Sequence, residues 1–259
     1  MRTAALACLW VSAASAASPL TFSSGPARVA LVELYTSEGC SSCPPAEEWL
    51  GSLIGRPGLW KDFVPVEFHV VYWDGLGWRD RLASREFTAR QYAYAAAWHA
   101  GNVYTPCFVR NGAEWRRDWG NGGAEGADAG LLRLEVGADG GCRVRFLPAG
   151  GERRTGPGPF DLHLAVLGGG ISSRVTAGEN RGATLTHEFV VLGLSEKPLA
   201  QDPSGPLLGA DLALPGAPGA GQSRRAVAAW VTRHGELDPL QAVGGWLPEA
   251  SRDSGLAPR

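Results

Sequence analysis

Apolar positions along the chain predict two buried strands and two helices in its first half. Residues 28–36 (RVALVELYT) form an almost unbroken apolar run, which is typical of a strand covered on both faces of a sheet. From about Ala46 the apolar positions adopt helical spacing, a second strand is predicted at 64–73, and a second helix at 84–99. The order strand, helix, strand, helix predicts a parallel α/β layer.

The chain beyond residue 118 has a different pattern. Residues 119–130 are rich in glycine and lack an apolar period, so we expect a linker there. Short β-like runs separated by turn residues follow at 131–136, 142–147, 161–168, 171–176, 184–192, 226–233 and 240–247. This spacing is typical of an antiparallel sandwich, interrupted by a mobile loop rich in Pro, Gly and Ala at 195–225.

Charge and the first residues narrow the class of protein. The 24 Lys and Arg residues nearly balance the 26 Asp and Glu residues, which argues against a nucleic-acid partner. Residues 1–16 combine a positive start, a short apolar run and small residues at a cleavage position, so we expect a signal peptide. No stretch is long enough for a transmembrane segment. We therefore expect an exported protein, periplasmic or extracellular, that ends in a tail at 249–259.

Export makes disulfides the default state of the cysteines that follow the signal peptide. Cys40-Ser-Ser-Cys43 lies between the first strand and the first helix, where a redox pair can place one thiol at a helix start and a second thiol to resolve the mixed disulfide. We expect Cys40 to face solvent and attack, and Cys43 to resolve. The alternatives are a static disulfide, or a zinc site with Cys107 and Cys142, whose spacing does not repeat C-x-x-C.

A Thr-Pro dipeptide adds a resemblance to a known fold. With C-x-x-C-P after the first core strand and Thr105-Pro106 opening a later strand, the chain resembles the thioredoxin fold. That resemblance implies a cis proline lying against the disulfide, with Thr105 and Pro106 as the wall on which a substrate chain or thiol docks. Without the resemblance, Pro106 would be an ordinary edge-strand or turn proline.

A closer resemblance covers about residues 28–247. The segments VELYTSEGCSSCPPAE, FHVVYWDGLGW, VYTPCFVRNG and GENRGATLTHEFVVLG resemble an uncharacterised family of secreted bacterial proteins, a domain of unknown function. The resemblance implies an α/β thioredoxin-like domain at 27–118 and a β-rich, sandwich-like domain at 131–248. Two residues depart from the family pattern, Val71 where Asp is common and Cys107 where Gln is usual.

Other residues are candidates for the same site. Glu33 precedes Cys40 by seven residues on the first strand, and in thioredoxin-like proteins a buried carboxylate below the pair moves a proton. A Glu reaching solvent from the strand end is the alternative. Trp73, Asp74 and Trp78 follow the second strand at the sheet edge where ligands gather, so they either form a substrate-binding rim or cover the core.

No metal and no cofactor is expected from the sequence. His69 interrupts an apolar strand and is interpreted as a core histidine, and His187 has no metal-ligand spacing. For the last two thiols we expect a Cys107–Cys142 bridge, which would close a loop of about 35 residues. The alternative places Cys107 beside the C-x-x-C as a third redox or metal thiol.

The sequence therefore predicts a possible enzyme, an exported thiol-disulfide oxidoreductase acting on a protein or a small thiol. One alternative is a Cu(I) chaperone that uses Cys40, Cys43 and Cys107 as soft ligands. Another is a non-catalytic extracytoplasmic binding protein with a structural disulfide. The direction of electron flow, the recycling partner, the oligomeric state and the role of the β-rich part stay open.

Overall fold

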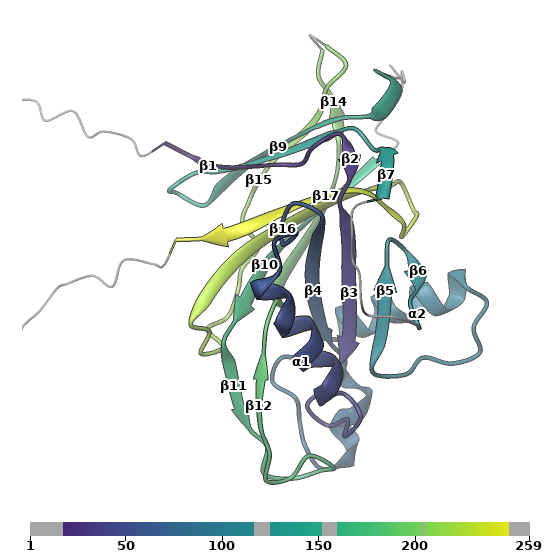
Figure 1. Cartoon of the computed structure of the whole chain (residues 1–259), viewed down its shortest axis with the longest axis vertical. Helices are drawn as coiled ribbons and strands as arrows, with labels where there is room; N and C mark the ends of the chain where they lie inside the picture. The colour runs from purple at the N-terminus through teal and green to yellow at the C-terminus, as the bar shows by residue number, and fades with distance from the viewer. Residues whose placement is uncertain (1–17, 117–124, 152–159, 204, 249–259) are drawn as a thin grey trace, which may run out of the picture.

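The computed structural model describes residues 18–116, 125–151, 160–203 and 205–248 (Figure 1). The signal peptide expected at 1–16, the tail at 249–259 and the first half of the expected linker lie outside the described residues. The second half of that linker contains strand β7 (Glu125–Asp128), which pairs with β2 (Ala27–Arg28).

An eight-stranded mixed sheet forms the centre of the molecule, in the order β17-β16-β10-β13-β4-β3-β5-β6 (Figure 1). Its strands are β3 (Ala30–Thr36), β4 (Phe63–His69), β5 (Cys107–Arg110), β6 (Ala113–Glu114), β10 (Phe160–Gly169), β13 (Val190–Pro198), β16 (Arg224–Arg233) and β17 (Pro239–Leu247). Strands β3 and β4 run parallel, and β5 pairs antiparallel with β3. On its other side β4 pairs in parallel with β13, through Val190 opposite Glu67.

The predicted fold class, an α/β thioredoxin-like domain followed by a β-rich domain, is wrong. Of the described residues, 45% lie in strands and only 16% in helices, and the strands form several sheets. Strands from both halves of the chain share the central sheet because β13 continues it beyond β4. Every residue of β10 is buried, as expected for a strand covered on both faces rather than for a sandwich strand with one face in water.

A second sheet has five strands in the order β1-β8-β9-β15-β14. These strands are β1 (Leu20–Ser23), β8 (Leu131–Val136), β9 (Gly141–Leu147), β14 (Ala200–Gln201) and β15 (Leu208–Ala213). Its inner face packs on β10, β16 and β17 in one apolar core, for example Leu134 and Phe146 with Leu164 and Val231. Strands β14 and β15 lie within 195–225, where the sequence predicts a loop.

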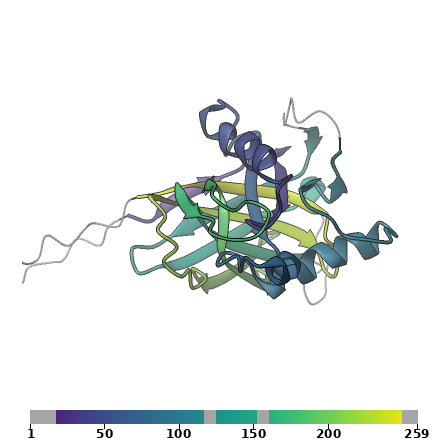
Figure 2. The same ribbon diagram turned by 90° about the horizontal axis from the view of Figure 1, so that it is seen from below.

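Two helices cover opposite faces of the central sheet (Figure 2). Helix α1 (Pro44–Ser52) packs on the face shown by Ala30, Val32 and Leu34, and α2 (Arg85–Ala97) on the face shown by Leu31 and Tyr35. Alternate residues of β3 thus meet different helices, because side chains alternate along a strand. In the described residues neither helix has the length and apolar run needed to cross a membrane.

The remaining elements are short. A two-stranded hairpin of β11 (Ile171–Arg174) and β12 (Thr184–His187) extends toward the start of α1 (Figure 1). The described residues include three 3-10 segments, η1 (Leu53–Gly55), η2 (Val71–Leu76) and η3 (Ala149–Gly151). Segment η2 begins where the sequence predicts that the second strand continues to residue 73, since β4 ends at His69.

Candidate functional site

A disulfide joins Cys40 and Cys43 in the loop between β3 and α1, with their Cα atoms 5.5 Å apart. Cys43 is the N-cap residue of α1, and two prolines occupy the first turn, where a missing N–H group costs no helical hydrogen bond. Gly39 brings the loop against Trp73, since a Cβ at position 39 would lie 3.0 Å from the Trp73 Cβ. The loop therefore depends on this glycine to pass close to η2.

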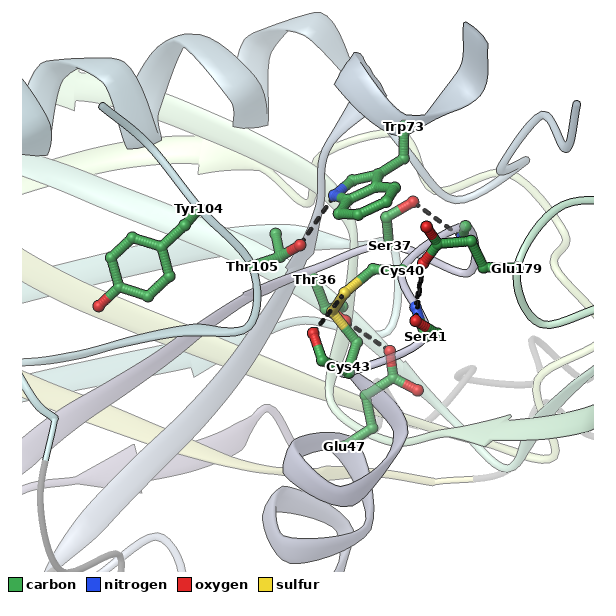
Figure 3. Close-up of a disulfide and its surroundings, with 12 residues drawn as sticks. Thr36, Ser37, Cys40, Ser41, Cys43, Glu47, Trp73, Tyr104, Thr105 and Glu179 are labelled. Atoms are coloured by element: carbon green, nitrogen blue, oxygen red, sulfur yellow. Dashed lines mark hydrogen bonds between the residues drawn. A yellow bond between two sulfur atoms is a disulfide. The ribbon is translucent and has the colours of Figure 1, made fainter. Parts of the chain in front are cut away.

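The loop that carries the disulfide is contacted by the tip of the β11–β12 hairpin, residues 176–182, which we call the roof loop. Asn180 donates from Nδ2 to the carbonyl oxygens of Glu38 and Cys40, each at 2.9 Å. The Glu179 carboxylate accepts hydrogen bonds from Ser41, from the N–H at 3.1 Å and from the hydroxyl at 2.7 Å (Figure 3). Cys40 and Cys43 are both 0% exposed, so the expectation that Cys40 faces solvent is wrong.

Thr105 and Trp73, two predicted substrate-binding residues, lie beside the disulfide (Figure 3). The Trp73 indole donates from Nε1 to Thr105 Oγ1 at 2.8 Å. The peptide bond between Thr105 and Pro106 is cis. Pro106 lines an open cavity of about 440 Å³ together with Tyr104, Phe108, Trp115 and Arg116.

Asp74 and Trp78 turn inward and hold the loop after η2. Asp74 Oδ1 accepts from the backbone N–H of Asp80 at 3.1 Å, and Trp78 Nε1 donates to Glu38 Oε2 at 2.7 Å. One carboxylate oxygen of Asp74 and the indole N–H of Trp78 are thus engaged within the protein. Of the predicted rim, Trp73 forms a hydrogen bond with the Thr-Pro dipeptide.

Glu33 is buried on the α2 face of the sheet. Its carboxylate pairs with Arg90 Nε at 2.9 Å and accepts hydrogen bonds from the hydroxyls of Tyr94 at 2.6 Å and Tyr35 at 3.0 Å. Glu33 is 0% exposed, which contradicts the alternative of a strand-end Glu in solvent. These three partners hold the carboxylate in a closed ion-pair cluster, where proton transfer would have to break a buried salt bridge.

Cys107 and Cys142 are free thiols, so the expected bridge between them is not formed. Cys107 packs in the core under α2, whereas Cys142 packs in the core between the two large sheets. Burial raises the pKa of each thiol to about 11. Both are therefore protonated near neutral pH.

A buried polar cluster, which the sequence does not reveal as a unit, lies on the α1 side of the central sheet. It consists of four carboxylates and two imidazoles, from Glu38, Glu47, Glu67, His69, Asp80 and His187. The cluster reaches the disulfide loop at Glu38 and α1 at Glu47, whose Oε1 accepts a 2.5 Å hydrogen bond from the Thr36 hydroxyl (Figure 3). The available sequence signal is the alternation of Glu67 and His69 on one face of an otherwise apolar strand.

Mutual contacts set the charge of the cluster. Burial by itself lowers the pKa of His69, but the carboxylates of Asp80, 2.6 Å from Nδ1, and Glu67, 2.8 Å from Nε2, raise it to about 10. Burial likewise raises the pKa of Asp80, yet His69 and backbone N–H groups bring it to about 2. Charged forms are thus favoured despite burial, because each group has a partner of opposite charge.

Two solved structures resemble the fold of this chain. A protein of Agrobacterium tumefaciens solved by a structural genomics consortium is 24% identical, with a TM-score of 0.52, over 90% of this chain and 99% of the other. HBP35 of Porphyromonas gingivalis is 15% identical, with a TM-score of 0.57, over 91% of this chain and 80% of the other. At these identities the likeness concerns the fold alone. Among curated proteins no sequence match is found.

The match to a protein family rests on the sequence itself. Residues 31–232 match the family described as "Protein of unknown function (DUF1223)". This span includes the disulfide loop, the Thr-Pro dipeptide, the roof loop and the buried polar cluster. The chain therefore belongs to the DUF1223 family.

Proposed function

We propose that the protein is a thiol-disulfide oxidoreductase whose redox pair is Cys40 and Cys43. The observation that carries the proposal is the position of the disulfide, which lies at a loop-to-helix junction beside Thr105. The residue after Thr105, Pro106, lines an open cavity. We propose that a disulfide-bearing chain binds in this cavity and reaches the pair past Thr105.

The reaction is an exchange between the reduced pair and a partner disulfide. The Cys40 thiolate attacks one sulfur of the partner, the partner's S–S bond breaks, and its other sulfur leaves as a thiolate. The Cys43 thiolate then attacks Cys40 Sγ in the mixed disulfide and releases the second partner thiolate. The partner gains two electrons and becomes a dithiol, the protein loses them and regains its disulfide, and the two protons of the cysteines end on the partner or in solvent.

The surroundings of the pair favour the oxidised state. Thiolates are stabilised by free N–H groups at a helix start, but Pro44 and Pro45 supply none. Both sulfur atoms are buried, and the Glu38 and Glu47 carboxylates lie in the same loop-to-helix region. Since all three features disfavour the thiolates of the reduced pair, we expect a reducing couple, with a potential below about −250 mV.

Two observations favour this role over Cu(I) transport. Cys40 and Cys43 are bonded to each other, so the oxidised protein offers neither sulfur as a thiolate ligand, and a copper site would exist only after reduction. The third thiol of a copper site, Cys107, packs in the core under α2, and burial raises its pKa to about 11, so a soft metal would have to displace its proton.

We also propose that the reaction takes place outside the cytoplasm. The support is the signal-peptide pattern of residues 1–16, together with a disulfide that a reducing compartment would not maintain. Fractionation of cells producing the tagged full-length chain tests this proposal. Recovery of the protein in the cytosol with residues 1–16 retained would contradict it.

The test of the activity is a redox titration of the purified protein without residues 1–16. We expect reversible two-electron reduction by graded dithiothreitol in the folded state, and a Cys43→Ser variant that captures a disulfide substrate as a stable mixed disulfide at Cys40. Cys107→Ser is the matched control, because it removes a thiol outside the pair. Failure of excess dithiothreitol to reduce the folded protein, or capture by Cys40→Ser instead, would overturn the proposal.

A further inference from the structure

The buried polar cluster contains atoms that the protein does not satisfy. Among the described residues, neither ring nitrogen of His187 makes a hydrogen bond of normal geometry, although carboxylate oxygens lie 3.3 and 3.4 Å away. Glu67 Oε2 and Glu38 Oε1 likewise accept no hydrogen bond of normal geometry. His187 is 0% exposed. A buried polar group without a hydrogen bond is costly, so several such atoms facing one another require an explanation.

These atoms converge on a set suited to metal ligation. One ligand atom from each of Glu67, His69 and His187 lies within 4.8 Å of the other two. His69 Nε2 is 2.8 Å from Glu67 Oε1, and His187 Nδ1 is 3.4 Å from the same oxygen. Glu47 Oε2, 3.3 Å from His187 Nδ1, supplies a fourth donor on the same side.

The opposite nitrogen of each ring faces a second carboxylate. His69 Nδ1 is 2.6 Å from Asp80 Oδ2, and His187 Nε2 is 3.4 Å from Glu38 Oε1. Metal-bound histidines nearly always present their other N–H to a carboxylate, a carbonyl or water, which fixes the ring and its tautomer. A structural salt bridge needs one such contact for each ring, whereas this arrangement provides an inner and an outer carboxylate for both.

From this arrangement we infer that Glu67, His69 and His187 bind a divalent transition-metal ion, with Glu47 as the fourth ligand and Asp80 and Glu38 as outer partners. Two imidazoles and two carboxylates form a donor set suited to Zn²⁺ in four-coordinate geometry. The absence of thiolate from the set disfavours Cu(I), and the imidazoles disfavour Mg²⁺ and Ca²⁺. The inference does not depend on the redox role of Cys40 and Cys43.

The position of the site assigns the metal a structural role. The ligands come from β4, α1 and β12, and the outer partners from the disulfide loop and the segment after η2. One ion would therefore tie the hairpin that carries the roof loop to the central sheet. The full burial of the ligands is typical of a closed structural site rather than a catalytic one with an open position.

The first experiment uses the folded protein without residues 1–16, stripped with a chelator and titrated with Zn²⁺ or Co²⁺ alone. We expect one equivalent to bind with a dissociation constant below about 1 μM, and bound Co²⁺ to show a visible spectrum of nitrogen and oxygen donors without thiolate charge-transfer bands. Because the Co²⁺ spectrum reports the donors in the unaltered protein, this reading does not depend on any variant folding. Absence of stoichiometric binding, or thiolate bands in the Co²⁺ complex, would overturn the inference.

Variants then identify the ligands. His187→Ala and the isosteric Glu67→Gln should each lower the affinity for Zn²⁺ at least 100-fold, while His163→Gln, which changes a buried histidine stacked on Trp230 outside the cluster, should leave it unchanged. Binding that persists in the Cys40→Ser/Cys43→Ser double variant separates this site from the redox pair. Unchanged affinity in both ligand variants would overturn the assignment, whatever the outcome of the redox titration.

Discussion

Two buried groups of charged residues lie on opposite faces of the same pair of strands. On the α2 face, Glu33 meets Arg90, Tyr35 and Tyr94, and both of its carboxylate oxygens accept hydrogen bonds. On the α1 face, the buried polar cluster contains four carboxylates and two imidazoles, and several of its atoms make no hydrogen bond of normal geometry among the described residues. The first group is complete by itself, whereas the second is not.

This difference teaches how a buried charge can be interpreted. The Arg90 guanidinium lies over the rings of Phe68, Tyr94 and Trp230, at 5.4 to 5.6 Å from their centroids, so the counter-ion of Glu33 is fixed by packing as well as by charge. Such a pair has no capacity left for a ligand. The buried polar cluster has unused lone pairs and converging donors, and these are properties of a binding site.

The largest effect is expected from breaking the ion pair between Glu33 and Arg90. Arg90→Met leaves the Glu33 carboxylate buried without a counter-ion and should lower the free energy of unfolding by about 3 to 5 kcal/mol. Urea unfolding of the purified variant measures this loss. The double variant Glu33→Leu/Arg90→Met should recover more than half of it, because no charge then stays buried. A loss below about 1 kcal/mol for Arg90→Met would show that the two groups do not differ in this way.

The next largest effect concerns metal binding by the buried polar cluster. Zn²⁺ at a free concentration 100-fold above its dissociation constant should raise the free energy of unfolding by about 2.7 kcal/mol, because the ion binds only the folded chain. Thermal unfolding with and without the ion measures the gain. His187→Ala should abolish it and Glu33→Gln should retain it, since Glu33 belongs to the other face. An equal gain in His187→Ala would contradict the comparison.

Local patterns predicted the parts of the molecule that local forces determine. The apolar run of β3, the two helices and the C-x-x-C at a helix start were all visible, since periodicity and turn residues act over a few positions. The order of strands in the central sheet was not visible in the sequence. The sheet is continued by β13, which reaches β4 through the single parallel pair Val190 and Glu67, more than 120 residues apart. No periodicity in either segment indicates that partner.

The candidate site was likewise predicted only in part. Cys40, Cys43, Thr105 and Pro106 were predicted from short motifs, and the structure places Thr105 beside the pair (Figure 3). The roof loop was missed because Asn180 contacts the carbonyl oxygen of Cys40 from 140 positions away in the sequence. Polar residues of this kind look like ordinary turn residues until the hairpin that carries them is placed. Long-range pairing therefore brings the roof loop to the disulfide loop.

A smaller effect is expected from the roof loop, on the rate at which the disulfide is reduced. Asn180→Ala removes two hydrogen bonds to the disulfide loop, and at about 1 kcal/mol or less for each the rate of reduction by dithiothreitol should rise about tenfold. Counting free thiols over time measures this rate. Arg181→Ala is the matched control, because among the described residues its exposed side chain makes no hydrogen bond to the loop. An Asn180→Ala rate equal to that of the control would show that the roof loop does not limit access to the sulfur atoms.

The smallest effect comes from the exposed contact between Glu179 and Ser41. Hydrogen bonds from the Ser41 hydroxyl and N–H lower the pKa of the Glu179 carboxyl below its ordinary value of 4.5. A carboxylate with a lowered pKa holds its contact above that range and releases it as the pH falls through the lowered pKa, because protonation removes the charged acceptor. The roof loop should therefore loosen on acidification, and the rate of reduction by a phosphine should rise about twofold between pH 6 and pH 3.5 relative to Glu179→Gln. Taking the ratio to that variant cancels the pH dependence of the phosphine and of the buried polar cluster. A ratio that stays constant across this range would show that the Glu179 charge does not contribute to closing the roof loop over the disulfide.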